Sequence, residues 1–284
     1  MLGKLIKYEW RGYRIFTTVS AIILIATTLI TSLSALTYTP YSSGTMEDIS
    51  DFLMVISFLL YYFGIIACSL GISLSIAVRF YKTCYTDQGY LTHTLPVTAR
   101  QLLHSKIIVA FINQILMIVG IFVSVMVVMC TYIMHIAKVE GEDISIAEII
   151  EAFSDGFTVP FETEMGISMG SFMATMIIFG IVGAICGVII IYGCISLGQL
   201  YTKHRIIGAI IAYFAVTTIQ QIAASIIGFA STYHFMSAFE RGRDLLFGDF
   251  YYNMMLIVYI PTIIISVILY FVTHYMMTKK LNLE

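Results

Sequence analysis

Long runs of apolar residues, separated by short polar segments, make up most of the chain. Because about 20 residues of helix cross a hydrocarbon core of roughly 30 Å, six of these runs are long enough to span a membrane. None of the six contains Asp, Glu, Lys or Arg. The runs cover residues 15–37, 52–77, 107–134, 171–196, 206–230 and 255–276. The pattern predicts an all-α integral membrane protein with six transmembrane helices, in which residues 1–284 form a single transmembrane domain.

The composition agrees with this prediction. Hydrophobic residues make up 59% of the chain and charged residues 11%, against about 45–50% and 25% in soluble domains. The 5 cysteines are odd in number, lie in or beside apolar runs and form no CxxC pair, so neither a disulfide framework nor a metal site is expected. No nucleic-acid partner is expected either.

The basic residues predict the orientation. Twelve of the 15 Lys and Arg residues lie in residues 1–14, 79–106, 197–205 and 278–284, on one side of the predicted membrane. By the positive-inside rule that side is cytoplasmic, and both termini lie on it. The alternative for the first run is a cleaved signal peptide, whose apolar region of about 7–15 residues would be shorter than residues 15–37.

Residues 1–14 have the pattern of a helix that lies on the membrane surface. At about 100° per residue, its cations fall on one face and its large apolar side chains on the other. The cations are Lys4, Lys7, Arg11 and Arg14, and the apolar side chains are Leu2, Leu5, Ile6, Trp10 and Tyr13. Glu9 interrupts the apolar face. It is either a solvated carboxylate or a partner for a basic residue on another element.

Residues 79–106 form the longest predicted cytoplasmic connection, where a plain turn between two spans needs only about 2–8 residues. Asp87-Gln88-Gly89 has the chemistry of a turn, and Pro96 disfavours helix at the residue before it. Thr98 and Gln101 form a capping box. We therefore expect a short helix at about residues 81–90, a break, and a new helix that begins near Ala99. The alternative is a plain amphipathic turn.

The two long outer segments differ in character. Residues 135–169 are strongly acidic, and the capping box formed by Ser145 and Glu148 predicts a short external helix. Residues 232–254 mix aromatic and charged side chains, which suits a re-entrant or interfacial element.

Several small and polar residues lie inside the spans. Gly64 and Gly71 share one stripe of the second span, and Gly183 and Gly187 form a GxxxG step in the fourth. Such residues allow close helix packing within the bundle, along a dimer interface or beside a transport path. The amide side chains in the spans either bond neighbouring helices or face a cavity. They are Asn113, Gln114, Gln220 and Gln221.

The sequence lacks the common motifs of nucleotide-hydrolysing enzymes, metalloproteases and serine hydrolases. It contains no GxxxxGK[ST], HExxH or GxSxG motif, so we expect no ATP hydrolysis or other enzyme activity and no cofactor in this chain. Ion-driven transporters usually place ionisable groups inside the membrane, and these spans have none. A secondary transporter is therefore disfavoured.

The connection and the N-terminus resemble a known family, the Firmicutes permease subunits of type-2 class ABC transporters. The family has an aromatic-basic run, an acidic-Gly-Tyr-Leu segment, Thr-Leu-Pro, and then a helix with Leu-Leu and Lys. Here these are Arg79 to Lys82, then Asp87, Gly89, Tyr90 and Leu91, then Thr94, Leu95 and Pro96, then Leu102, Leu103 and Lys106. Leu5 to Trp10 (LIKYEW) resembles the family's opening. The long acidic segment 135–169 departs from the family pattern.

The resemblance implies an architecture and a power source. It implies an N-terminal elbow helix at residues 1–14 and a coupling helix between the second and third spans, here residues 81–92. The coupling helix would dock into one of two cytoplasmic ABC ATPase subunits, which would bind the ATP and Mg²⁺. A second permease copy or a paralogue would complete a twelve-span dimer in the bacterial cytoplasmic membrane.

The resemblance also implies roles for particular residues. Arg79 and Lys82 would anchor the coupling helix at the headgroups, Asp87 would be its charged contact, and Glu9 would tie the elbow helix to it. Tyr81, Tyr85 and Tyr90, with Gly89 and Leu91 in the same motif, would meet the ATPase groove.

The implied function is export of an amphipathic or apolar cargo, such as a drug, an antimicrobial peptide or a lipid. Asn113, Gln114, Gln220 and Gln221 would line its path. The rival interpretation is a membrane sensor or assembly subunit that works without an ATPase.

Overall fold

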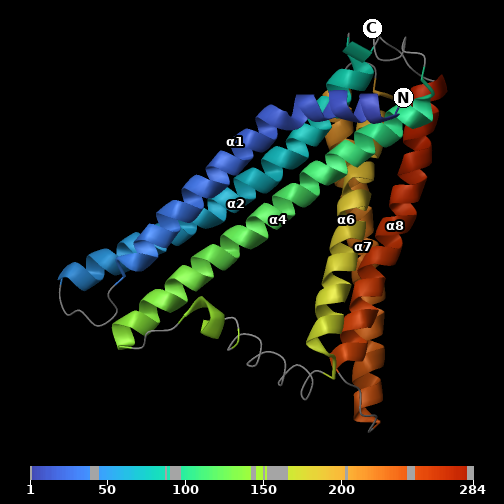
Figure 1. Ribbon diagram of the computed structural model, residues 1–284. Coiled ribbons are helices and arrows are strands. Elements are labelled where there is room, and N and C mark those ends of the chain that lie inside the picture. The colour runs from blue at the N-terminus through green and yellow to red at the C-terminus, as the bar shows by residue number, and fades with distance from the viewer. Residues whose placement is uncertain are drawn as a thin grey trace. The chain divides into compact units, whose positions relative to one another are not determined.

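The computed structural model describes residues 2–38, 45–86, 88–89, 97–141, 145–149, 151, 166–201, 204–241 and 247–279. Within these ranges the chain is helical and has no strand. Six helices are long and apolar enough to cross a membrane, as the sequence predicts, so the protein is a multi-pass membrane protein. They are α1 (Leu2–Leu36), α2 (Thr45–Tyr85), α4 (Ala99–Glu140), α6 (Met169–Gly198), α7 (Arg205–Glu240) and α8 (Phe247–Lys279), coloured in chain order in Figure 1.

The chain divides into two compact units, which we describe separately. Unit 1 comprises Met1–Glu9, Ile76–Phe111 and Phe157–Glu284. It holds α6, α7 and α8 together with the adjoining ends of α1, α2 and α4. Unit 2 comprises Trp10–Ser75 and Ile112–Gly156, and holds the remaining lengths of α1, α2 and α4.

Three helix boundaries differ from the sequence prediction. Residues 2–14 are the first turns of the continuous helix α1 rather than a separate element. Helix α2 continues beyond residue 77 to Tyr85, because Phe80, Cys84 and Tyr85 are buried and extend its apolar face at helical spacing. The described residues of the expected re-entrant element belong to the ends of α7 and α8.

Both predicted capping boxes are present. The Thr98 amide donates to Gln101 Oε1 (3.4 Å), the Gln101 amide donates to Thr98 Oγ1 (3.3 Å), and α4 begins at Ala99. The Ser145 amide donates to Glu148 Oε2 at 2.7 Å, and the Glu148 amide donates to Ser145 Oγ at 3.3 Å. Each box satisfies amides that the first turn of a helix leaves without partners.

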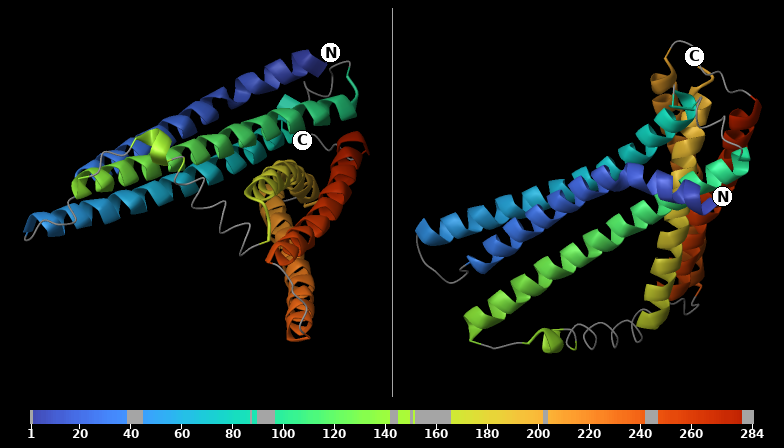
Figure 2. Two further views of the ribbon diagram at one scale, coloured as in Figure 1. Left: turned by 60° about the horizontal axis from the view of Figure 1, so that its bottom comes forward. Right: turned by 45° about the horizontal axis from the view of Figure 1, so that its top comes forward.

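In unit 1, helices α6, α7 and α8 lie side by side, as the views of Figure 1 and Figure 2 agree. Ile190, Cys194 and Leu269 form a core cluster. Glycines on α6 allow the close approach, since a Cβ at Gly193 would lie 2.6 Å from Leu269 Cβ. A Cβ at Gly198 would lie 2.4 Å from the backbone nitrogen of Ala209 on α7.

In unit 2, hydroxyl groups join α1, α2 and α4. Ser124 Oγ of α4 lies 2.8 Å from Thr28 Oγ1 and 2.6 Å from Tyr61 Oη, and all three side chains are buried. Hydroxyl pairs of this kind hold helices together in a membrane, where lipid offers no hydrogen bonds.

We expect Ser124→Ala to lower the free energy of unfolding by about 1–3 kcal/mol, because both Thr28 and Tyr61 lose a buried partner. Thermal unfolding of the purified protein in detergent micelles measures this loss. Thr131→Ala is the control, since Thr131 lies on the same helix, is half-buried and donates its hydroxyl to the backbone carbonyl of Val127 within that helix rather than to another helix. Equal stability of the Ser124 and Thr131 variants would show that the hydroxyl junction contributes nothing.

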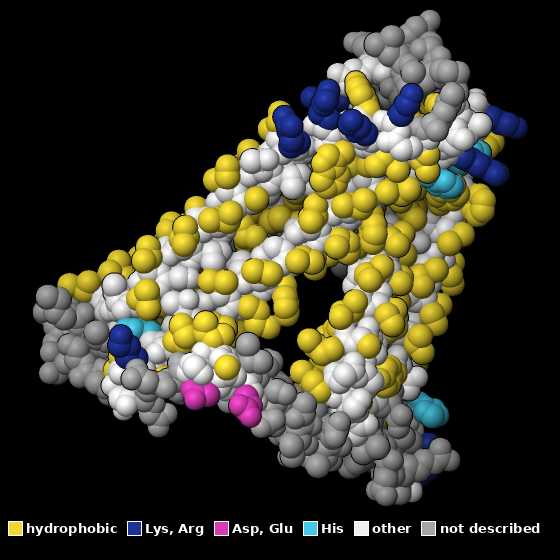
Figure 3. Space-filling model, in the orientation of Figure 1, with side chains coloured by type: hydrophobic (Ala, Val, Ile, Leu, Met, Phe, Trp, Pro, Cys, Tyr) yellow, Lys and Arg dark blue, Asp and Glu magenta, His cyan; other side chains and the backbone are white. Residues whose placement is uncertain are grey.

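The surface of the helices suits a lipid environment. Apolar side chains cover the visible faces of the long helices, while Lys and Arg side chains gather along the first turns of α1 (Figure 3). Lys4, Lys7, Arg11 and Arg14 are all exposed. The first turns therefore present the basic face that the sequence predicts.

Candidate functional site

Glu9 is the centre of a buried ion cluster in unit 1. Its side chain projects from the first turns of α1 and the residue is only 5% exposed. Its Oε2 lies 3.0 Å from Nε of Arg79 on α2, and its Oε1 lies 2.5 Å from Nζ of Lys106 on α4. One carboxylate thus bridges cations from two further helices.

Lys106 is held on several sides. The residue is 2% exposed, and its Nζ also donates to Thr83 Oγ1 at 2.6 Å. The Thr83 hydroxyl is positioned by the backbone carbonyl of Arg79, 2.8 Å away. The backbone carbonyl of Lys106 accepts from Tyr192 Oη of α6 at 3.2 Å. Side chain and backbone of this residue therefore tie α4 to α1, α2 and α6.

Aromatic packing joins the end of α2 to α6. The rings of Phe80 and Tyr192 stack with centroids 3.9 Å apart and 13° between their planes. Tyr85 Oη lies 2.8 Å from Ser196 Oγ, and its ring meets that of Phe80 edge-on at 5.9 Å. Phe80 and Tyr192 are each only 1% exposed, so this packing shields the ion cluster from water on the α6 side.

The buried charges of the cluster stabilise the packing of the helices that carry them. Removal of charges from water is costly, and a buried ion pair repays that cost only with good geometry and further hydrogen bonds. Here both oxygens of Glu9 accept from cations, and Lys106 has a second acceptor in Thr83. The cluster fixes the relative positions of three helix ends, and removal of one member would leave buried charge uncompensated.

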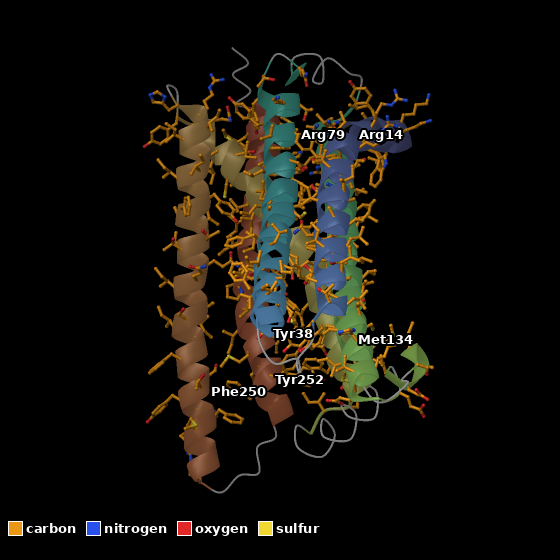
Figure 4. The ribbon with its side chains drawn as sticks, turned by 90° about the vertical axis from the view of Figure 1, so that its left-hand side faces the viewer. Arg14, Tyr38, Arg79, Met134, Phe250 and Tyr252 are labelled. Atoms are coloured by element: carbon orange, nitrogen blue, oxygen red, sulfur yellow. The ribbon has the colours of Figure 1, made fainter. Side chains whose placement is uncertain are left out.

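In the sequence, Arg79 on α2 and Lys106 on α4 stand on either side of the predicted coupling segment, residues 81–92. Arg79 lies near the end of α2, and Phe250 and Tyr252 lie at the opposite end of unit 1 (Figure 4). Of the two interpretations of Glu9, the structure favours contact with basic residues, since it pairs with Arg79 and Lys106.

The other predicted coupling residues are placed differently. Tyr81 is half-buried and Lys82 is exposed, while the Gly89 amide donates to the Thr86 carbonyl at 2.6 Å in a turn. Tyr85 faces α6 and is 3% exposed, so it packs inside unit 1 rather than on a surface that a partner could contact. Asp87, Tyr90 and Leu91 lie outside the described residues.

The amide side chains of the spans have different surroundings. Asn113 of unit 2 is fully buried, and its Oδ1 accepts from Thr17 Oγ1 of α1 at 2.6 Å, while Gln114 is half-buried. In unit 1, Gln220 donates to Thr262 Oγ1 of α8 at 2.5 Å, and Gln221 is exposed. Asn113 and Gln220 therefore bond neighbouring helices, which is one of the two roles expected from the sequence.

The predicted packing glycines are not alike. A Cβ at Gly64 would lie 2.8 Å from Thr27 Cγ2, and one at Gly183 would lie 3.2 Å from Tyr259 Oη. Both glycines therefore allow close helix contacts. A Cβ at Gly71 would have no atom of the described residues within 4 Å of it. Gly187 is half-buried.

Sequence reasoning missed Lys106 and Thr83 as members of the ion cluster. It also missed Tyr192 and Ser196 as the α6 residues that contact the ends of α2 and α4. A signal for Lys106 was present, because helical spacing puts it on the same face as Leu102 and Leu103, and both are buried. Tyr192 and Ser196 come from a span far along the chain, and a single sequence does not indicate that contact.

No group of three His, Cys, Asp or Glu residues within the described ranges could hold a metal ion. A search of family models, of curated proteins and of solved structures found no match to the chain.

Proposed function

We propose that the chain is the membrane-spanning permease subunit of an ATP-driven ABC exporter, powered by two separate ATPase subunits. The observation that carries this proposal is the Glu9 cluster, which joins both ends of the connection between α2 and α4 to one block of side chains. The resemblance of residues 79–106 to such permeases suggested the class, and the cluster supports a mechanical role for that connection.

The mechanical argument follows from the contacts. Residues 86–98 link the end of α2 to the start of α4. Arg79 and Lys106, near the two ends of this link, share Glu9, and Tyr85 and the Lys106 carbonyl bond to α6. Because the interior is packed and the ion pairs are buried, a force on the link moves the attached helices instead of deforming the link alone. A subunit that receives work from a neighbour needs such a connection.

The proposal fixes the partners and the location. By the positive-inside rule the link and both termini are cytoplasmic, within reach of an ATPase at the bacterial cytoplasmic membrane. ATP and Mg²⁺ bind to that partner, and the permease itself is not an enzyme. Its other partners are the lipid bilayer and a second permease copy or a paralogue.

The cargo class rests on the side chains of the spans. They contain no acidic or basic residue, and a charged cargo would find no counter-ion there. An amphipathic or apolar molecule, such as a drug, an antimicrobial peptide or a lipid, suits these surroundings.

The docking surface comprises Tyr81, Lys82, Asp87, Tyr90 and Leu91. Arg79 and Glu9 position it from within the cluster, and Tyr85 is left out because it is buried against Ser196.

We expect Asp87→Lys and Tyr90→Ala to weaken ATPase binding by about tenfold or more, the effect of a typical interface hot spot. Cargo-stimulated ATP hydrolysis of the complex in proteoliposomes should fall to the unstimulated rate. Tyr201→Ala is the control, because Tyr201 is an exposed aromatic on another predicted cytoplasmic loop. Normal stimulation in both variants would remove this segment from the coupling role.

Purification of the tagged chain from its native membrane tests the class itself. The proposal expects an ATPase in the eluate whose ATP hydrolysis is needed for transport by the reconstituted complex. A chain that purifies without one, or that transports without ATP on an imposed proton or sodium gradient, would overturn the proposal.

A further inference from the structure

A groove lies at one end of unit 2, where the end of α1 meets the first half of α2. It encloses about 450 Å³, within the range of about 300–1,000 Å³ that is usual for ligand sites. Tyr38, which follows α1, lies at the end of unit 2 opposite Arg14 (Figure 4). The groove is lined by Tyr38, Asp51, Met54, Val55, Phe58 and Leu59.

The walls of the groove are held in place by contacts to neighbouring helices. His135 of α4 donates from Nε2 to the backbone carbonyl of Tyr38 at 2.6 Å. Thr31 of α1 donates to the backbone carbonyl of Ser57 on α2 at 3.1 Å, and both residues are buried. The groove is therefore a fixed part of the packing of unit 2.

The lining changes from charged to apolar along α2. Asp51 directly precedes the apolar run of residues 52–77, on the side that the basic residues predict to be outside. The other lining residues of α2 are apolar and follow on the same helix face. Leu59, the last of them, lies about 12 Å further along the helix axis, at 1.5 Å per residue. The groove thus combines a carboxylate at the membrane boundary with apolar walls inside the predicted span.

The carboxylate of Asp51 favours a cation. The residue is exposed, and no hydrogen bond or ion pair joins its carboxylate to the described residues. Tyr38 and Phe58 line the same groove, and aromatic rings attract organic ammonium ions through cation–π interactions. An anionic head group would be repelled by the carboxylate at this position.

The apolar walls select little by themselves. Lipid tails are as apolar as the side chains of Val55 and Leu59, so an alkyl chain gains little free energy when it leaves lipid for the groove. The head group therefore decides which amphiphile the groove prefers. Its charge needs no counter-ion inside the spans, because Asp51 lies at the boundary.

We infer that the groove binds amphiphiles that combine an ammonium head group with an alkyl chain, with the head group beside Asp51 and the chain along Val55 and Leu59. This inference deepens the proposed function, since it makes the cargo cationic and the groove the site of its release. The role as cargo rests on the proposed function, whereas binding to the groove does not.

Spin-labelled alkyl chains of one length that differ in head group test the inference. In nanodiscs of zwitterionic lipid, electron paramagnetic resonance measures the fraction of each probe that the protein immobilises. A trimethylammonium probe should associate about fivefold more tightly than a neutral hydroxyl probe, the combined effect of an exposed ion pair and a cation–π contact. A sulfate probe should associate less than either. Equal association of the three probes overturns the inference and leaves the groove to ordinary lipid chains.

Asp51→Asn should lower association of the ammonium probe about fivefold, to the level of the hydroxyl probe. Glu151→Gln is the matched control, because Glu151 is an exposed carboxylate on the same predicted side and does not line the groove. It removes the same net charge and should leave the association unchanged. An equal loss in both variants would show that general surface charge attracts the probe, and would overturn the site.

A tryptophan in the groove tests the position of the alkyl chain. Val55 is 59% exposed, so Val55→Trp fills the groove without disturbing buried packing. This variant should lose the preference for the ammonium probe. Leu60→Trp should keep the preference, because Leu60 is exposed on the same helix and does not line the groove. An unchanged preference in Val55→Trp places the probe elsewhere and overturns the inference.

The two proposals can fail separately. Ammonium selectivity that depends on Asp51, in a chain that purifies without any ATPase, would sustain the groove as a binding site and overturn the exporter proposal. An ATPase in the eluate together with equal association of the three probes would do the reverse.

Discussion

Replacement of Glu9 by Gln is expected to lower the free energy of unfolding by about 3–5 kcal/mol, the cost of removing one partner from a buried ion pair. Lys106 is 2% exposed and would retain Thr83 as its only side-chain acceptor among the described residues. Arg79 suffers less, because its side chain is 18% exposed and reaches water. Circular dichroism during unfolding in mixed micelles measures the global loss, and the fluorescence of the single tryptophan, Trp10, reports on the neighbouring site.

Two further variants make this result specific. Lys7→Gln removes an exposed charge from the same turns of α1 and should change stability by no more than about 0.5 kcal/mol. Lys106→Met combined with Glu9→Gln replaces the buried pair by neutral groups and should recover much of the loss, since apolar replacements of buried ion pairs are often neutral. The single variant Lys106→Met completes the comparison. If the double variant loses as much free energy of unfolding as Glu9→Gln and Lys106→Met lose together, Glu9 and Lys106 do not interact.

Substitution of Gly198 by Ala is expected to destabilise the protein by about 1–3 kcal/mol, despite the better helix propensity of alanine. The added Cβ would lie 2.4 Å from the Ala209 backbone nitrogen and 2.6 Å from its Cα. Backbone atoms cannot rotate aside as a side chain can, so α6 and α7 would have to separate. Thermal unfolding in detergent measures the change.

Gly180 supplies the matched control on the same helix. A Cβ at Gly180 would have no atom of the described residues within 4 Å of it. Gly180→Ala should therefore leave the free energy of unfolding unchanged or raise it by up to about 1 kcal/mol. If both alanine variants are equally stable, α6 and α7 do not make this close contact at Gly198.

The local features of this fold could be predicted from the sequence. Hydropathy identified the six spans, because a membrane imposes their length and composition. The start of α4 at Ala99 followed from the capping box of Thr98 and Gln101, which involves only neighbouring residues. Glu9 could be singled out because a carboxylate on the apolar face of a helix requires a partner or solvent.

The features that were missed depend on tertiary contacts. Tyr85 was expected to face a partner protein, yet it packs against Ser196, which lies 111 residues later in the chain. The same contacts extend α2 beyond residue 77, where the predicted span ends, to Tyr85. Burial of Phe80 against Tyr192 outweighs the polar residues around it, and a single sequence does not show which aromatic side chains will meet.

The order in which the cluster residues are synthesised has a consequence for biogenesis. The pair of Glu9 with Arg79 becomes available once two spans have left the ribosome, and Lys106 follows with the third. Tyr192, which stacks on Phe80 and bonds to the Lys106 carbonyl, arrives only with α6. A chain synthesised only as far as the third span therefore carries these charges before the aromatic side chain that covers them on the α6 side has been made.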